Sequence, residues 1–200
     1  IALWAWGIGC KDAVFVPDFT FFSSGECPAT SGATPIFVDV LPSTYNLDPI
    51  KLEKAIKKVL YEGKYTPKAV IAVDLFGLPA DYDRIRPICE KYNLLLLEDA
   101  AQGFGGTLHN KRACSFGNIS TTSFFPAKPL GCYGDGGAIF TDDEKLATTI
   151  RSICVHGKGG EDKYNNIRLG MNSRLDTLQA AILIPKLKAF KEYELDKVNE

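Results

Sequence analysis

Residues 94–102 read Leu-Leu-Leu-Leu-Glu-Asp-Ala-Ala-Gln. Four consecutive leucines followed by acidic residues predict a buried strand that ends at a polar edge. Similar short apolar runs occur at residues 13–17, 35–40, 69–73, 119–125 and 137–141. Because helical patterns separate several of these runs, the sequence predicts an α/β fold, in which a mostly parallel sheet carries helices on both faces.

The spacing of apolar residues predicts where the helices lie. Helical spacing occurs at residues 47–61, 82–92 and 144–154, and Asp142 or Asp143 is expected to cap the last of these. A longer amphipathic pattern runs from Ser173 to about Lys197, and Pro185 is expected to kink it. Residues 157–166 are polar and rich in glycine, which predicts a loop.

The composition narrows the classes of function. The 200 residues carry 23 basic and 24 acidic side chains, so no basic field is present to hold nucleic acid or an anionic membrane. No apolar run approaches the ~18 residues of a membrane span, and residues 1–6 lack the basic start of a signal peptide. The six cysteines form no C-x-x-C pair and only two histidines occur, so we expect no metal site, reduced thiols and a cytoplasmic location.

Polar segments follow three of the predicted strands, at residues 18–21, 98–102 and 123–128. Ligands of open parallel sheets bind beyond the carboxyl ends of the strands. Together the three segments offer an aromatic ring, a carboxylate, an amide, a hydroxyl and an amine. We therefore expect them to meet at one edge of the sheet and to form a small-molecule site.

Pyridoxal phosphate (PLP) requires such a set of groups. A lysine forms a Schiff base with its aldehyde, and a carboxylate pairs with the pyridinium nitrogen that makes the ring an electron sink. A donor reaches the ring oxygen, an aromatic side chain stacks on one face, a small residue leaves room on the other, and hydroxyl groups help to hold the phosphate. In that order, the candidates are Lys128, Asp99, Gln102, Phe21, Ala101 and Ser123.

Several motifs follow one another in the order of a known family. They are residues 7–17, 20–21, 32–40, 98–102, 123–128 (Ser-Phe-Phe-Pro-Ala-Lys), 134–137 (Gly-Asp-Gly-Gly), 170–176 and 179–181. In these motifs the chain resembles, over nearly its whole length, the DegT/DnrJ/EryC1/StrS family of PLP-dependent sugar aminotransferases of fold type I. The block at residues 172–183 looks most like the branch that acts on UDP-3-keto-N-acetylhexuronic acids.

The resemblance implies roles for the residues around the cofactor. Lys128 is the Schiff-base lysine, which also moves protons between the substrate α carbon and C4′ of the cofactor. Asp99 pairs with the pyridinium nitrogen, and Gln102 bonds the ring oxygen. Phe21 stacks on the ring, and Ser123 binds the phosphate.

The resemblance also implies a homodimer with shared active sites. Asn172 matches the asparagine that reaches the phosphate of the neighbouring subunit. Arg174 could contact an acidic substrate group in bidentate fashion, and His156 is a further candidate for a substrate contact. Both residues also have the simpler interpretation of a solvated surface side chain.

The reaction implied is PLP-dependent transamination of a nucleotide-linked keto sugar, with glutamate as the amino donor, in amino-sugar and surface-polysaccharide biosynthesis. A sugar dehydratase of the same superfamily would carry histidine in place of Lys128. A dinucleotide-binding site is disfavoured because Gly7-x-Gly9 lacks the third glycine and a preceding strand. A non-catalytic regulator with this fold, or an inactive fragment of such an enzyme, would also carry these motifs.

By the same resemblance, residues 1–155 form the PLP-binding large domain, residues 156–172 a loop toward the dimer partner, and residues 173–200 a long helix that leads toward a C-terminal small domain. The family's phosphate-binding Gly-Thr segment and its small domain have no match in the sequence. We therefore expect the chain to be a fragment of a longer protein.

Overall fold

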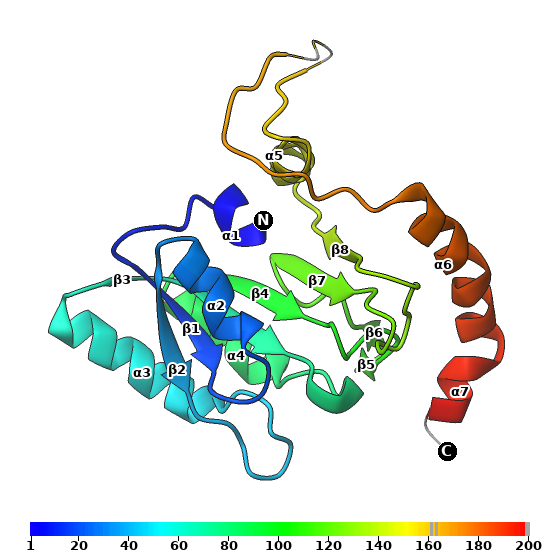
Figure 1. Cartoon of the computed structure of the whole chain (residues 1–200). Coiled ribbons are helices and arrows are strands. Elements are labelled where there is room, and N and C mark those ends of the chain that lie inside the picture. The colour runs from blue at the N-terminus through cyan, green and yellow to red at the C-terminus, as the bar shows by residue number, and fades with distance from the viewer. Residues whose placement is uncertain (161, 163, 199–200) are drawn as a thin grey trace.

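A six-stranded sheet forms the centre of the molecule (Figure 1). The computed structural model describes residues 1–160, 162 and 164–198. The strands lie in the order β2 (Thr34–Val38), β1 (Asp12–Pro17), β3 (Thr66–Val73), β4 (Leu95–Asp99), β7 (Ile119–Ser123) and β8 (Gly137–Phe140). The first five are parallel and β8 is antiparallel to β7, which confirms the predicted mostly parallel sheet.

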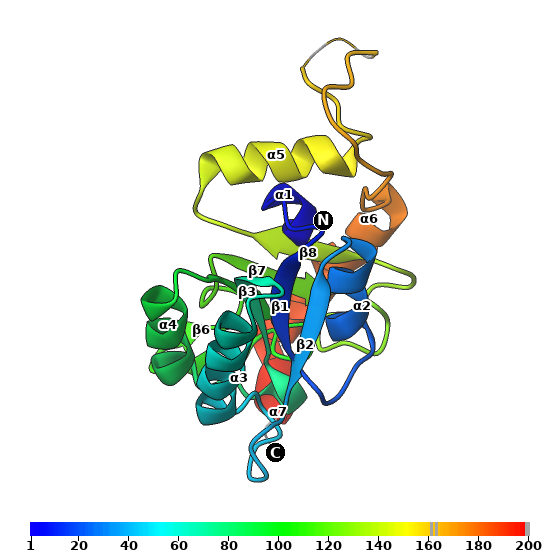
Figure 2. The ribbon, with the colours of Figure 1, turned by 90° about the vertical axis from the view of Figure 1, so that its left-hand side faces the viewer.

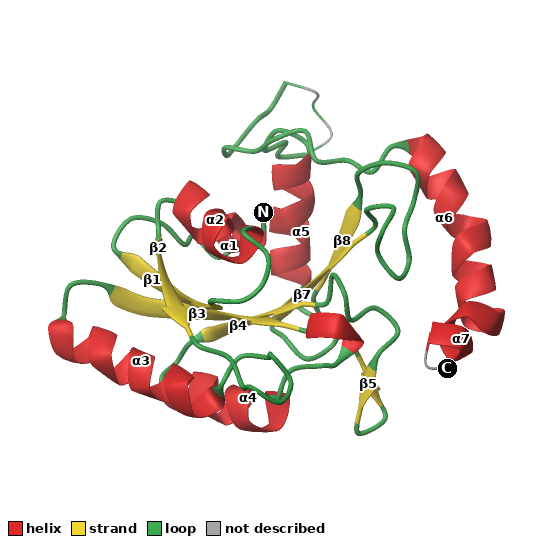
Figure 3. Ribbon diagram, turned by 60° about the horizontal axis from the view of Figure 1, so that its bottom comes forward, coloured by secondary structure: helices red, strands yellow, loops and turns green. Residues whose placement is uncertain are grey.

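Helices cover both faces of this sheet (Figure 2, Figure 3). On one face lie α3 (Pro49–Glu62) and α4 (Tyr82–Lys91). On the other lie α1 (Ala2–Ala5), α2 (Ser23–Thr30) and α5 (Glu144–Cys154). The α/β architecture is therefore the one that the alternating strands and helices predict.

Neighbouring residues of the buried strands serve the two faces. Val70 packs with Phe15 in the core beneath α3 and α4, whereas Ile71 packs with Val14 in the core beneath α1 and α5. Successive side chains of a strand point to opposite faces of the sheet. An unbroken apolar run such as residues 94–97 can thus supply both cores at once.

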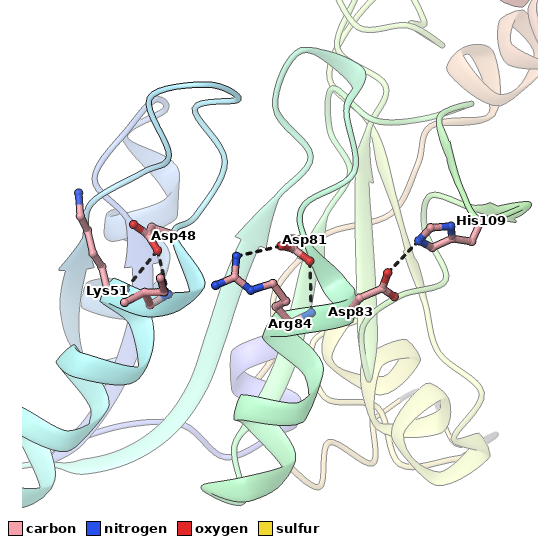
Figure 4. Close-up of polar contacts among 7 residues, drawn as sticks. Asp48, Lys51, Asp81, Asp83, Arg84 and His109 are labelled. Carbon is pink, nitrogen blue, oxygen red and sulfur yellow. Dashed lines mark hydrogen bonds and ion pairs between the residues drawn. The ribbon is translucent and has the colours of Figure 1, made fainter.

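Acidic residues begin three of the helices. Asp48 Oδ1 accepts a hydrogen bond from the N–H of Lys51 at 3.3 Å, and Asp81 accepts one from the N–H of Arg84 at 3.3 Å (Figure 4). Asp143 caps α5 in the same way, as predicted. These contacts satisfy backbone donors that the first turn of a helix leaves free.

The C-terminal helical region differs from the prediction. The helix α6 (Thr177–Ala189) begins four residues later than Ser173 and continues through Pro185. A π-helical turn, Phe190–Glu194, and the short α7 (Leu195–Val198) follow. The change from α-helical geometry thus comes at Phe190, whose ring is buried against residues 130–132, rather than at the proline.

The structure does not describe every residue of the predicted elements. Residues 161 and 163 of the predicted loop segment, and residues 199–200 of the predicted helical segment, lie outside the described residues. The strands β5 (Thr107–Leu108) and β6 (Lys111–Arg112) form a small separate hairpin. No described helix is both long enough and apolar enough to cross a membrane.

Candidate active site

A cleft of about 1280 Å³ opens beyond the carboxyl end of the sheet. The segments after β1, β3, β4 and β7 contribute Phe21, Phe76, Gln102 and Lys128 to its walls. The strand order reverses between β1 and β3, and ligands of open α/β sheets bind where such a reversal occurs. The structure thus brings the three polar segments found in the sequence to one cleft.

Lys128 lies in a tight loop after β7. Its backbone N–H donates a hydrogen bond to the carbonyl oxygen of Phe125 at 2.9 Å. From α6, Gln179 Oε1 accepts a hydrogen bond from the N–H of Tyr133 at 2.9 Å, which ties the far end of the loop to that helix. The Lys128 side chain is half-buried in the cleft and forms no ion pair with the described residues, so its amine is available to a ligand.

The Gln102 amide is oriented by a backbone donor. The N–H of Phe76 donates to Gln102 Oε1 at 2.9 Å. Phe76 itself adopts a left-handed backbone conformation, with φ of 55°. Because the amide oxygen is engaged, the NH₂ group is the part of Gln102 available to donate a hydrogen bond to a ligand.

Asp99 is the last residue of β4, and its carboxylate Oδ1 accepts a hydrogen bond from the N–H of Ala101 at 3.0 Å. Asp99 lines a neighbouring cavity of about 620 Å³, together with Cys27 and Thr121. Burial raises the pKa of Asp99, while the hydrogen bond from Ala101 and the charge of Lys128 act to lower that pKa. Asp99 and Lys128 are therefore electrostatic neighbours, although their side chains line adjoining cavities.

The remaining cofactor candidates take different positions around the cleft. Ser123 lines the cleft, and its Oγ accepts a hydrogen bond from the N–H of Phe125 at 3.2 Å. Phe21 lies at the rim with 72% of its surface exposed. Ala101 is half-buried beside Asp99. An aromatic face is thus present at the mouth of the cleft, and it is open to a stacking partner.

Asn172, Arg174 and His156 are not among the residues that line the cleft. All three are exposed. Asn172 forms an isolated backbone bridge with Val155, and Arg174 lines a separate cavity of about 510 Å³. The N–H of His156 donates to a backbone carbonyl at 3.2 Å. Within one copy of the chain, the structure does not bring these residues to Lys128.

Two buried carboxyl groups beneath the site are absent from the set of candidates drawn from the sequence. Asp74 follows β3 directly, and Glu98 precedes Asp99 in β4; both are 0% exposed. The sequence signal for Asp74 is its place immediately after a buried strand, the same place that makes Asp99 a candidate. Among the described residues, no group of three or more potential ligands could hold a metal ion.

Comparison with known proteins matches nearly the whole chain to one family. Residues 1–198 match the DegT/DnrJ/EryC1/StrS aminotransferase family. The chain belongs to this family. It is 53% identical over 190 residues to the UDP-2-acetamido-2-deoxy-3-oxo-D-glucuronate aminotransferase of Pseudomonas aeruginosa, an alignment that covers 94% of this chain and 50% of that protein. The chain thus spans about half the length of the curated relatives it matches.

Solved structures of the family share the fold. A DegT DnrJ EryC1 StrS aminotransferase from Brucella abortus superposes with a TM-score of 0.93 at 53% identity, over 96% of this chain and 51% of that one. NtdA from Bacillus subtilis, with bound cofactor PMP, superposes with a TM-score of 0.83 at 36% identity, over 97% of this chain and 42% of that one. The predicted fold type is therefore confirmed.

Proposed function

We propose that this chain carries the PLP-binding part of a sugar aminotransferase, with Lys128 as the residue that bonds the cofactor. The observation that supports this most is the convergence of Lys128, Gln102 and Ser123 on one cleft, with Asp99 close enough for its pKa to respond to the lysine charge. The PMP bound to the related NtdA supports the same class of cofactor.

The donor set fits the cofactor. When bound, PLP supplies an aldehyde carbon that exchanges an amino group and a protonated ring that stores the electron pair released at the substrate carbon. Burial raises the pKa of Asp99, which disfavours its ionised form. A cationic ring nitrogen beside Asp99 would favour the ionised form, as the charge of Lys128 already does. The Gln102 NH₂ would donate to the ring oxygen, the Ser123 hydroxyl to the phosphate, and Phe21 would stack on the ring.

Lys128 would also perform the proton transfer. Its Nζ is the one amine contributed to the cleft by the described lining residues. Once released from the cofactor, Nζ would take a proton from the substrate α carbon and deliver it to C4′, and the reverse in the second half of the reaction. The Ala101 side, with its single methyl group, would leave room beside the ring.

The amino acceptor that we propose is a nucleotide-linked 3-keto sugar, with glutamate as donor. The name of the Pseudomonas aeruginosa relative specifies a UDP-linked 3-oxo uronate. A carboxylate of that kind would suit the guanidinium of Arg174, which offers a bidentate fork. These substrates would serve amino-sugar and surface-polysaccharide biosynthesis, which we place in the cytoplasm.

We further propose that the working unit is a homodimer with shared active sites. Asn172, Arg174 and His156 are exposed and lie away from the cleft of their own chain, which suits a contribution to the site of a second copy. In this arrangement residues 1–155 form the PLP-binding domain, residues 156–172 reach the partner, and residues 173–200 lead toward a small domain.

The test is amino transfer itself. The protein is supplied with PLP, glutamate and a UDP-3-keto-N-acetylhexuronic acid, and both 2-oxoglutarate and the amino sugar are measured by mass spectrometry. Equal amounts of the two products, lost in Lys128→Ala, are expected. Release of 2-oxoglutarate no faster than in Lys128→Ala would contradict the proposal. Omission of the keto sugar serves as the control that sustained release of 2-oxoglutarate depends on the amino acceptor.

A further inference from the structure

A buried carboxyl group lies behind the Gln102 contact. Asp74 is 0% exposed, and its backbone N–H donates to the carbonyl oxygen of Asp99 at 2.9 Å. Its Oδ1 accepts hydrogen bonds from the Tyr82 hydroxyl at 2.6 Å and from the Ala80 N–H at 3.0 Å. No donor among the described residues reaches its Oδ2. An ionised carboxylate with an unpaired buried oxygen would be costly, whereas a protonated one has an O–H to donate.

Glu98 is the neighbouring buried acid, and donors engage both of its carboxylate oxygens. Its two oxygens accept hydrogen bonds from the N–H of Cys114 at 2.5 Å, from the N–H of Phe116 at 2.6 Å and from the Ser120 hydroxyl at 2.6 Å. Two carboxylates in one buried site cannot both ionise cheaply. Burial first, and then the charge and hydrogen bonding of Glu98, raise the pKa of Asp74 to about 8. Asp74 is therefore the partner that keeps a proton.

Asp74 also touches the segment that carries Gln102. A Cβ added at Gly103 would lie 2.5 Å from the Asp74 Cβ, so the Asp74 side chain rests against the backbone next to Gln102. Two residues along the chain from Asp74, the N–H of Phe76 holds the Gln102 amide. A movement of Asp74 would thus disturb both partners of that hydrogen bond.

We propose that protonated Asp74 is a positioning residue, which bridges Glu98 and Tyr82 and thereby fixes the Gln102 amide and the Asp99 end of β4. The inference rests on the proposed PLP function, because those two groups are the ones that would face the ring. With a proton on Oδ2, the Asp74 O–H would donate to the Glu98 carboxylate, the side-chain hydrogen bond that raises the Asp74 pKa. Loss of that proton places two carboxylates side by side and loosens residues 74–80.

The titratable groups that face Asp74 come from three parts of the structure. They are Tyr82 from α4, Glu98 and Asp99 from β4, and Cys114 from the loop after β6. Burial raises the pKa of Tyr82 well above its ordinary value and that of Cys114 to about 12. An alkaline transition near pH 8 in this region is assigned to Asp74 by its absence in Asp74→Asn.

The experiment compares the protein with its Asp74→Asn and Asp74→Leu variants. Asparagine keeps the shape, the acceptor and a donor toward Glu98, whereas leucine keeps only the volume. Hydrogen exchange of residues 74–80 is followed by mass spectrometry, corrected for its intrinsic pH dependence, and the Kd for PLP is measured in parallel. We expect the exchange rate and the Kd of Asp74→Asn to stay within about threefold of those of the unmodified protein. Asp74→Leu should exchange about tenfold faster and bind PLP about tenfold more weakly, because a tenfold change corresponds to the loss of one hydrogen bond.

The pH dependence separates positioning from simple packing. Exchange of residues 74–80 should accelerate above pH 8 in the unmodified protein and not in Asp74→Asn. If Asp74→Leu does not fold, Tyr82→Phe replaces it. The hydrogen bond from the Tyr82 hydroxyl lowers the Asp74 pKa, so removing that hydroxyl should move the alkaline transition to higher pH. An alkaline transition in Asp74→Asn equal to that of the unmodified protein would overturn the inference. Failure of every variant and of the unmodified protein to bind PLP would instead refute the proposed function. The hydrogen-exchange data would still test the role of Asp74, because they do not depend on PLP binding.

Discussion

Replacing Asp74 by asparagine should change how the stability of the protein responds to pH. The carboxyl is fully buried, and burial raises its pKa from 3.8 to about 8. Between these values the unfolded chain has released the Asp74 proton while the folded protein keeps it. The folded state then binds more protons, so the free energy of unfolding falls as the pH rises.

The size of the effect follows from the same two values. Each pH unit inside this window should cost the unmodified protein about 1.4 kcal/mol from this one group. Asparagine has no proton to release, so the stability of Asp74→Asn lacks this slope. From pH 5 to pH 7 the variant should therefore gain about 2.7 kcal/mol relative to the unmodified protein. Any constant offset from the amide group cancels in this difference.

Urea unfolding at several pH values between about 5 and 7 measures that difference directly. Fluorescence of Trp4 and Trp6 and circular dichroism should give coincident transitions. The raised pKa of Asp99 and the lowered pKa of Glu53 are common to both proteins and therefore cancel. Parallel stability curves for the two proteins would refute the reasoning, because they would mean that Asp74 is ionised in the folded state.

Three further substitutions test other parts of the structure. Gly103→Ala should destabilise the protein by about 1–3 kcal/mol in urea unfolding, because the new Cβ would overlap Asp74. Gly9→Ala should be close to neutral, because the nearest atom to its new Cβ lies at 3.5 Å. Equal losses of stability in the two variants would contradict this. Asp48→Ala should cost about 1 kcal/mol in thermal unfolding, because it removes the α3 cap. Asp83→Ala should cost less, because it removes an exposed contact with His109 and one acidic residue of the first turn of α4 but no cap (Figure 4). The reverse order of the two losses would contradict this. Gln102→Leu should weaken PLP binding about tenfold in a fluorescence titration but lower stability by less than ~1 kcal/mol, since Phe76 is exposed and its N–H can bond water; unchanged affinity would argue against the assigned role.

The strands and the placement of the central site residues could be predicted from the sequence. Asp99 ends the strand that begins with the leucine run, and Lys128 lies in the segment that follows β7. The carboxyl ends of neighbouring parallel strands must lie at one edge of the sheet. The six predicted strands correspond to β1, β2, β3, β4, β7 and β8. Unbroken apolar runs carry this information because both faces of the sheet are buried.

The helix α2 could not be predicted in the same way. Its sequence, Ser-Ser-Gly-Glu-Cys-Pro-Ala-Thr, contains poor helix formers. Packing contributes instead: Gly25 lets the Phe37 ring lie close to α2, since a Cβ at position 25 would come within 2.8 Å of that ring and displace it. Local propensity does not report such a contact between distant residues.

The carboxyl pair beneath the site also emerges only in space. Asp74 and Glu98 are 24 positions apart in the sequence, and nothing in the residues around either one predicts the contact. The register that pairs Ala72 with Glu98 and Val73 with Asp99 brings them together. Similarly, the resemblance assigns Asn172 and Arg174 to the site, whereas within one chain they lie outside the cleft.

The identity of the lysine that bonds the cofactor can be measured directly. The protein is incubated with PLP and treated with sodium borohydride, which converts a lysine–cofactor linkage into a stable amine, and the modified peptide is identified by mass spectrometry. We expect one adduct per chain, on Lys128, and its loss in Lys128→Arg. An adduct distributed over exposed lysines, or one that persists unchanged in Lys128→Arg, would contradict the account.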